Sequence, residues 1–322
     1  MESELELDEP ITVGTKNPYD VTADVAGLKT LFVNVFFIGE PGHGNPWVLI
    51  DAGLMGYAGT IKSRAEELFG PGTKPKAIVL THGHADHTGS LKTLLNDWDV
   101  PVYAHRLEIP YLTGKSSYPP PDPAIGGGGM SYMSWIFPIG PMDFGDAIQP
   151  IAENGLIPEL PDWGAIHTPG HAPGHISLFR DKDRTLIAGD AFVTTNQNAI
   201  SAVATQREEF HGPPAYFTCD WEAAKQSVIK LNNLNPLAAG TGHGIAVRGL
   251  ELELGLNRLA HEFESRSNPS SGGRYVTQAA ITDEHGIVEM PTPVSFHVAR
   301  GLDLGLVAGL LAYMIWTIRR DR

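Results

Sequence analysis

The nine residues 81–89, THGHADHTG, constrain this chain more than any other part of its sequence. They follow the apolar run 77–80, AIVL, which is typical of a buried strand. Three histidines and one aspartate occur within six positions: His82, His84, Asp86 and His87. Imidazole and carboxylate groups are costly to bury without partners, so packing does not explain the cluster. Nitrogen and oxygen ligands in a turn that leaves a strand suit zinc or a similar ion, so the pattern predicts a metal-binding turn.

Three later residues could complete a two-metal site. His171 lies in TPGHAPGH, Asp190 closes TLIAGD, and His243 lies in GTGHG. Each of them follows an apolar run and is flanked by glycine, which is how a rigid scaffold delivers side chains to one edge of a sheet. We therefore expect these three side chains to meet the turn at residues 82–87.

Apolar runs alternate with helical patterns along the chain. Runs rich in β-branched and aromatic residues predict strands over 31–38, 47–50, 77–80, 102–104, 164–167, 176–180, 185–188 and 237–239. Helical spacing with terminal signals predicts helices over 60–69, 90–98, 221–234 and 249–264. Strands that alternate with helices indicate a layered α/β fold.

Residues 108–142 interrupt this alternation with a proline cluster, four glycines and several aromatic residues. A long irregular segment in a compact domain is often a lid or binding loop. For its PPPDP and GGGG portion, a disordered surface excursion is the alternative. We divide the chain into a catalytic domain over 1–265 that includes this segment, a linker and extended piece over 266–300, and an apolar C-terminal helix over 301–322.

Residues 304–318 are almost wholly apolar and are followed by Arg319 and Arg320. The run is somewhat shorter than the roughly 20 residues that span a bilayer, but it could anchor the protein or lie in the interface. A helix docked on the protein's own surface or on a partner subunit is the alternative. The all-round apolar character of the run favours membrane contact.

Charge and cysteine content exclude several classes of protein. A formal net charge of −14 would repel a phosphate backbone, so we expect no nucleic-acid partner. The single cysteine, Cys219, excludes an internal disulfide and removes thiolates as metal ligands. The N-terminus lacks the basic start and apolar stretch of a secretory signal, so we expect a cytoplasmic protein. The sequence leaves the oligomeric state open.

The ordered set of motifs resembles the metallo-β-lactamase superfamily. The HxHxDH motif, the later histidine, the aspartate and the last histidine match that family in order, over about residues 30–264. Asp51, in WVLIDAG, matches the family's acidic residue behind the metal-binding turn. The resemblance implies a four-layer αββα sandwich of the metallo-β-lactamase type.

The resemblance also implies which side chains hold metal. Seven residues would bind two ions: His82, His84 and His171 the first, Asp86, His87 and His243 the second, with Asp190 bridging them. We expect two zinc ions, with iron or manganese as alternatives.

Two metals close together lower the pKa of a shared water, so a metal-bridging hydroxide would be available near pH 7. We expect this hydroxide to attack the carbonyl of a small-molecule lactone, ester or thioester. Asp86 could also shuttle a proton to the leaving group. Tyr216, in GPPAYF, could donate a hydrogen bond to the substrate carbonyl, as in similar lactonases. A half-buried packing tyrosine is the alternative.

Departures from other branches of the family narrow the reaction. Oxygen-reducing diiron relatives carry a glutamate where this chain has Gly83, and the β-lactamases lack the bridging aspartate that Asp190 provides. Arg248 and Arg258 stand apart, so no clear basic cluster is present to grip glutathione as in the glyoxalase II branch. A fairly apolar lactone, ester or thioester is therefore the expected substrate.

Three alternatives stay open. The first is a glyoxalase II-like thioesterase. The second is a mononuclear iron persulfide dioxygenase that would use His82, His84 or His171 together with Asp190. The third is a non-catalytic, membrane-tethered binding protein on a retired enzyme fold.

The remaining histidines are expected to play lesser parts. His175 is interpreted as a group that orients a ligand or its loop. Three others could line the pocket or be structural: His105, His167 and His211. Four have no motif and are expected on the surface: His43, His261, His285 and His297.

Overall fold

A computed structural model describes residues 17–123, 125, 128–267 and 273–292. The predicted apolar helix over 301–322, its run 304–318 and His297 lie outside the described residues. Among the helices that the model does describe, none is both long enough and apolar enough to cross a bilayer.

The first sheet has six strands in sequence order. They are β1 (Val25–Thr30), β2 (Val33–Ile38), β3 (Val48–Ile50), β4 (Ile78–Val79), β5 (Val102–Ala104) and β6 (Ile148–Pro150). The first three pair antiparallel, and β3 to β6 pair parallel. Parallel pairing brings the carboxyl ends of β3 to β6 to one edge, where the turn at 82–87 follows β4.

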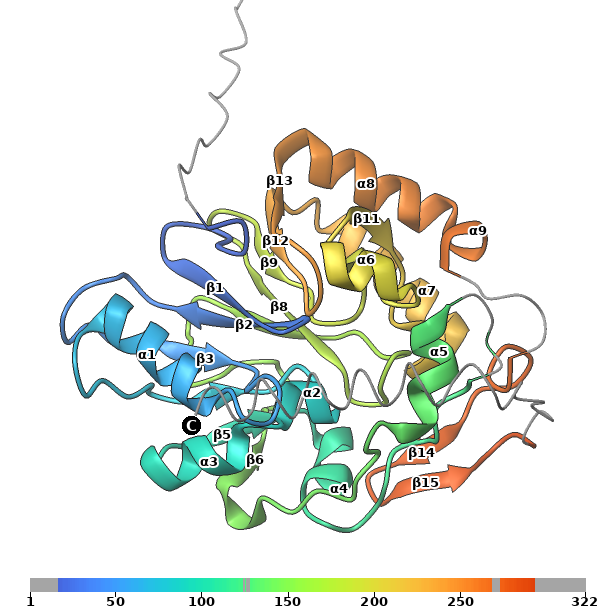
Figure 1. Cartoon of the computed structure of the whole chain (residues 1–322), viewed down its shortest axis with the longest axis horizontal. Coiled ribbons are helices and arrows are strands. Elements are labelled where there is room, and N and C mark those ends of the chain that lie inside the picture. Colours follow the sequence, from blue (N-terminus) through green and yellow to red (C-terminus); the bar gives the residue numbers. More distant parts are fainter. Residues whose placement is uncertain (1–16, 124, 126–127, 268–272, 293–322) are drawn as a thin grey trace, which may run out of the picture.

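Helices α1 (Ala58–Phe69) and α3 (Leu91–Asp97) cover the outer face of this sheet (Figure 1). Side chains of β2 alternate between two cores, because successive residues of a strand point to opposite faces. Val35 and Phe37 pack in the core that includes α1 and α3 side chains. Phe36 and Ile38 pack in the core between the two sheets.

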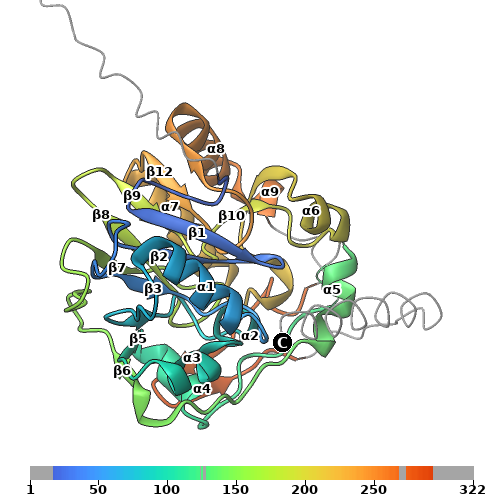
Figure 2. The ribbon, with the colours of Figure 1, turned by 60° about the vertical axis from the view of Figure 1, so that its left-hand side comes forward.

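The second sheet has five strands, in the order β13 (Val247–Arg248), β12 (Ala238–Gly240), β9 (Thr185–Ile187), β8 (Ile176–Arg180) and β7 (Gly164–His167). Leu178 and Ile187 face the first sheet. Phe179 and Leu186 pack in the core that contains buried side chains of α7 (Trp221–Asn233) and α8 (Gly249–His261). These contacts give the order helices, sheet, sheet and helices, and Figure 2 shows α8 at the top and α3 near the bottom with the strands between them. The predicted four-layer αββα sandwich is confirmed.

Each predicted strand and helix overlaps an observed one. Outside the segment 108–142, the strands and α-helices that were not predicted are β1, β6, β13, β10 (Val193–Thr195), β11 (Glu208–His211), α2 (Ala85–Thr88), α6 (Ile200–Thr205) and α9 (Phe263–Ser267). The extended piece expected within 266–300 contains β14 (Ile281–Asp283) and β15 (Gly286–Glu289). The sequence of β1, VAGLKT, contains a glycine and a lysine, which interrupt the apolar run that would predict a strand. Gly27 is needed there because a Cβ would lie 2.1 Å from the backbone oxygen of Tyr19.

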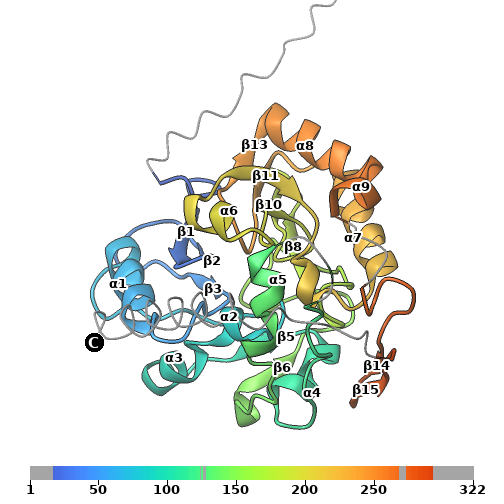
Figure 3. The ribbon, with the colours of Figure 1, turned by 45° about the vertical axis from the view of Figure 1, so that its right-hand side comes forward.

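The irregular segment 108–142 packs closely on the rest of the molecule. It contains α4 (Ile109–Leu112) and α5 (Gly129–Met133), and Tyr118 and Ile125 within it are buried. Figure 3 shows α5 between α4 and α6, and the amide of Met130 donates to the carbonyl of Asn198 at 3.3 Å. Trp135, just after α5, is 59% exposed. A role as a lid stays a prediction.

Residues 273–292 contact this same segment. The Tyr275 hydroxyl donates to the carbonyl of Pro120 at 2.7 Å, and the Tyr275 side chain is buried. The β14–β15 hairpin, at the lower right of Figure 1, places Gly286 against Ser116. The predicted domain limits stay predictions.

Candidate metal centre

All seven residues singled out in the sequence lie at one edge of the sandwich. Their potential ligand atoms form three overlapping groups, and within each group these atoms lie within 4.8 Å of one another. The groups are His82, His84 and His171; His82, His87 and Asp190; and Asp86, His87 and His243. The predicted meeting of strand ends is therefore observed.

The local backbone of the turn explains how four donors fit into six residues. His84 has an extended conformation and immediately precedes the short helix α2, which carries Asp86 and His87. Gly83 lies between the first two histidines in a crowded place. A Cβ there would lie 2.5 Å from the Tyr118 hydroxyl and 2.7 Å from the side chain of Leu112.

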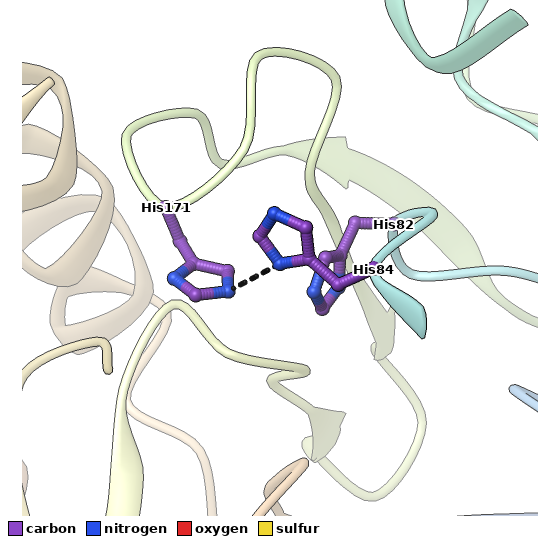
Figure 4. Close-up of side chains that lie close together, drawn as sticks. All are labelled: His82, His84 and His171. Carbon is purple, nitrogen blue, oxygen red and sulfur yellow. Dashed lines mark hydrogen bonds between the residues drawn. The ribbon is translucent and has the colours of Figure 1, made fainter. Parts of the chain in front are cut away.

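The first group consists of three imidazoles that converge from two loops (Figure 4). His84 Nδ1 and His171 Nε2 are 3.0 Å apart. The His82 ring stands edge-on to both, with ring centroids 4.6 Å from His84 and 4.9 Å from His171. Three nitrogens in such proximity form a ligand set of the kind that zinc prefers.

The Asp190 carboxylate lies between this group and the next. Its Oδ2 atom is 3.2 Å from His243 Nε2, 3.4 Å from His171 Nε2 and 3.6 Å from His87 Nε2. Asp86 Oδ2 is 3.6 Å from His243 Nε2 and 3.9 Å from His87 Nε2. The Asp86 side chain is 24% exposed, whereas the others are buried, so it faces the open side of the site.

Hydrogen bonds behind the site fix the orientation of two imidazoles. His87 Nδ1 is 2.8 Å from Asp51 Oδ2, and His243 Nδ1 is 2.7 Å from the carbonyl of Phe32. Both acceptors hold a proton on Nδ1, which leaves the Nε2 lone pair for a metal. Asp51 also accepts from the amide and the hydroxyl of Thr81, at 2.7 and 2.8 Å.

His175 lies behind Asp190, as expected for a group that orients a ligand loop. Its Nε2 accepts from the Asp190 amide at 2.8 Å, and its Nδ1 is 3.1 Å from the Thr168 carbonyl. Burial and the neighbouring His171 lower the pKa of His175 to about 3, so it is neutral. A neutral ring suits these two hydrogen bonds.

Burial and electrostatics divide the site into two parts. Burial and the adjacent imidazoles hold the pKa values of His82 and His84 well below the usual value. Burial alone would lower the pKa of His87, but the carboxylates of Asp190, Asp86 and Asp51 outweigh burial, so the pKa of His87 lies well above its usual value. The pKa of Asp190 stays well below its usual value despite burial, because His243 and His87 lie beside it.

The donor set fits divalent cations. Among the described residues, His82 Nε2, His87 Nε2 and Asp190 Oδ1 are buried with no hydrogen-bond partner. Unpartnered polar atoms are costly in a protein interior, and three in one cluster indicate a site for a bound ion. Two metal ions, one on each side of Asp190, would provide these three atoms with partners, and nitrogen and oxygen atoms are suitable ligands for such ions.

Aromatic side chains lie beside the ligand candidates. The Phe217 ring lies 4.6 Å from the His84 ring, and the Phe32 ring stacks on His243 at 6.1 Å. Tyr216, on the turn η4 (Ala215–Phe217), is only 4% exposed. Burial raises the pKa of Tyr216 well above its usual value, and the Asp86 and Asp190 carboxylates add to this shift. Its hydroxyl therefore stays protonated and can donate a hydrogen bond.

Other histidines lie apart from the cluster. His105 and His167 stack at 4.1 Å and line a cavity of about 420 Å³ together with Arg106 and Glu153. His211 is buried on β11. The three described residues expected at the surface are indeed exposed: His43, His261 and His285.

One group close to the site was not singled out in the sequence. Glu108 is fully buried and bonds to backbone amides in two ligand loops, at Gly83 and Gly174. Burial raises the pKa of Glu108 to about 7, although hydrogen bonds from Tyr118 and these amides oppose the shift. In the sequence it is an ordinary glutamate at the start of an irregular segment.

Comparisons with known proteins agree with this geometry. The family model described as "Metallo-beta-lactamase superfamily" matches residues 28–243. The chain is 46% identical over 247 residues to "Probable metallo-hydrolase YflN" of Bacillus subtilis (strain 168), covering 77% of this chain and 94% of that protein. It is 30% identical to "Probable metallo-hydrolase YybB" of the same organism, covering 66% and 80%. The solved structure of MEM-A1, a subclass B3 metallo-beta-lactamase from a soil metagenome library, shares the fold with a TM-score of 0.53 at 18% identity, covering 77% of this chain and 94% of that one.

Proposed function

Because this chain belongs to the metallo-β-lactamase superfamily, we propose that it is a dinuclear metal-dependent hydrolase of a small lactone, ester or thioester. His82, His84 and His171 would hold one ion, and three further residues would hold the other: Asp86, His87 and His243. The observation that carries the proposal is the position of Asp190. Its Oδ2 atom lies within 3.2–3.6 Å of imidazoles from both groups, as a bridging ligand requires.

When bound, the metal ions would supply Lewis-acid activation of water and of a carbonyl group. Asp86 is the one ligand candidate that is partly open to solvent, so its carboxylate can take up a proton and pass it to a leaving group. The protonated Tyr216 hydroxyl can donate a hydrogen bond to a substrate carbonyl oxygen. The buried imidazoles keep their ligand nitrogens fixed and exclude water from the floor of the site.

The aromatic rings beside the ligand candidates favour a substrate that has apolar parts. Phe32 and Phe217 lie beside ligand histidines of opposite groups, and Phe137 packs 5.9 Å from Tyr216. Rings in these places can bury an acyl or alkyl chain while the carbonyl points to the metals.

Metal content and a substrate panel test this proposal. We expect about two divalent ions per chain and turnover of at least one lactone, thioester or aryl ester from a panel that also includes β-lactams. His84→Ala should lose at least about 100-fold in kcat/KM with loss of metal. His261→Ala, which removes an exposed histidine far along α8, is the matched control and should stay within about twofold of the parent.

Two results would change the conclusion. About one iron per chain with oxidation of a persulfide would favour the dioxygenase alternative. A chain that binds no metal under any loading condition would contradict a hydrolase of this type altogether.

A further inference from the structure

The Glu108 carboxylate connects two loops that are remote in sequence. Its Oε2 atom accepts from the amide of Gly83 at 2.9 Å, and its Oε1 atom accepts from the amide of Gly174 at 2.7 Å. The hydroxyl of Tyr118 donates to the same Oε2 atom. The side chain is 0% exposed, so these three donors replace all of its contact with water.

Both amides belong to loops of the first ligand group. Gly83 stands between His82 and His84, and Gly174 lies three residues after His171. One carboxylate therefore spans the two loops whose imidazoles must converge. The distance between its two oxygens is fixed by covalent geometry, so it sets the separation of the loops as a rigid spacer.

The two glycines leave the room that this arrangement needs. A Cβ at Gly174 would lie 2.8 Å from Glu108, and a Cβ at Gly83 would lie 2.5 Å from the Tyr118 hydroxyl. Tyr118 in turn packs its ring 4.6 Å from that of His84. The contacts around Glu108 thus fit closely on both sides.

A second contact joins the same two stretches of chain. Glu108 ends the turn η1 (Arg106–Glu108), and His105 immediately before it stacks on His167 at 4.1 Å. His167 Nε2 is 2.9 Å from the carbonyl of Pro173, next to Gly174. The segment 105–108 and the His171 loop are therefore held together at two points.

The second ligand group is held by other residues. Asp51 bonds to His87, and the Phe32 carbonyl bonds to His243. The Asn34 side-chain amide donates to the carbonyls of Thr241 and Gly244, at 2.9 and 2.7 Å, and so fixes the His243 loop. The described contacts of Glu108 include none of these groups.

We propose that Glu108 is a positioning residue that sets the geometry of the first metal site and leaves the second largely unaffected. This inference rests on the proposed two-metal function. A carboxylate is suited to the task because both of its oxygens accept hydrogen bonds. Glutamine has nearly the same size, but its terminal NH₂ would face an amide donor, so one of the two loops would lose its bond to residue 108.

Metal affinity of the two sites, measured separately, tests the inference. The chain is loaded with cobalt or zinc, the two dissociation constants are measured by competition with a chelator, and ¹⁵N-histidine NMR assigns each loss to its ligand group. In Glu108→Gln we expect the first site to weaken by about 10–100-fold and the second by less than about threefold. Asn34→Ala is the reciprocal control and should weaken the second site more than the first.

Each outcome decides the matter. Equal weakening of both sites in Glu108→Gln, or none, would overturn the inference while leaving the two-metal proposal intact. A parent chain that binds fewer than two ions would overturn both. If the glutamine variant does not fold, Tyr118→Phe replaces it, because it removes one bond to the same oxygen. A loss of about threefold confined to the first site supports the inference, and an equal or absent loss overturns it.

Discussion

The two halves of the chain deliver their ligand candidates in different ways. The half that forms the first sheet supplies four of them from a single turn, residues 82–87. The half that forms the second sheet supplies His171, Asp190 and His243 from three separate loops. A compact turn can be organised by one neighbour, and Asp51 does this through hydrogen bonds to Thr81 and His87. Three loops need three separate supports.

Those supports come largely from the opposite half. Glu108 holds the loop of His171, and Phe32 holds His243, although both belong to the first half. Asp190 is supported from within its own half, by His175, and the His171 loop is also held there by the contact of His167 with the carbonyl of Pro173. The site is therefore an interface between two sheets, and its second half depends on contacts that span long sequence distances.

Replacement of Asp190 should have the largest effect, because this carboxylate touches imidazoles from both halves. In Asp190→Ala we expect kcat/KM to fall by at least about 10³-fold and at least one metal ion to be lost. Activity and metal content of the purified variant check this. Asp162→Ala, at an exposed ion pair with Lys182, should change neither. A variant that retains both ions would show that Asp190 does not bridge.

Asp51→Asn should have the second-largest effect. It should weaken both metal sites, because Asp51 bonds to Thr81, next to His82 of the first group, and to His87 of the second group. Asparagine keeps the size of the side chain but places an NH₂ group against Thr81 or His87, which are donors. We expect a loss of about 10–100-fold in kcat/KM with weaker binding at both sites. Chelator competition measures this. A loss confined to one site would show that Asp51 supports only the ligand group of that site.

The contrast between the halves also explains what the sequence could predict. The family and the αββα sandwich were predicted and are confirmed. Continuous apolar runs predicted the central strands, because a strand that is buried on both faces consists mainly of apolar residues. Strands β1 and β13 lack that pattern, since Gly27 in β1 avoids a clash with the backbone of Tyr19 and Arg248 in β13 donates to the carbonyl of Val21.

The candidate site divides in the same way. The turn at 82–87 is visible in local spacing, and the three later residues are visible through their flanking glycines and their order. Among the supports, Asp51 and His175 were singled out in the sequence, but Glu108 and Phe32 were not. Glu108 acts through backbone amides 25 and 66 residues away, and Phe32 acts through its carbonyl, which carries no side-chain signal. The ligand roles themselves stay a proposal.

Tyr216→Phe should have a smaller effect, because it removes one hydrogen bond to substrate and no support of the metals. We expect about a tenfold fall in kcat/KM with unchanged metal content. Tyr111→Phe is the matched control: its buried hydroxyl has no hydrogen-bond partner among the described residues, so its loss should leave activity within about twofold. Unchanged turnover in Tyr216→Phe would assign Tyr216 to packing.

The smallest effect should come from a contact that joins the halves away from the site. The buried Arg180 guanidinium of β8 donates to Asp24, next to β1, at 2.5 and 2.9 Å, and to Asp183. Burial alone would raise the pKa of Asp24, but bonds from Arg180 and Thr22 outweigh it and lower that pKa. Asp24→Asn should therefore reduce the free energy of unfolding by about 1–2 kcal/mol at pH 7, with activity retained.

The pH dependence gives this last prediction its sign. A carboxyl whose pKa is lower in the folded chain than in the unfolded chain stabilises the fold above its unfolded pKa, near 3.8. That contribution is lost as the pH falls through the folded value. Denaturant titrations of the parent and Asp24→Asn should differ by a constant amount between about pH 5 and 7, begin to converge near the unfolded pKa of 3.8 and meet below the folded pKa. Asp183 keeps its bond to Arg180 in both chains, so convergence of the two free energies of unfolding would assign the difference to the bond between Asp24 and Arg180. A difference that persists at low pH would mean that Asp24 acts through packing instead.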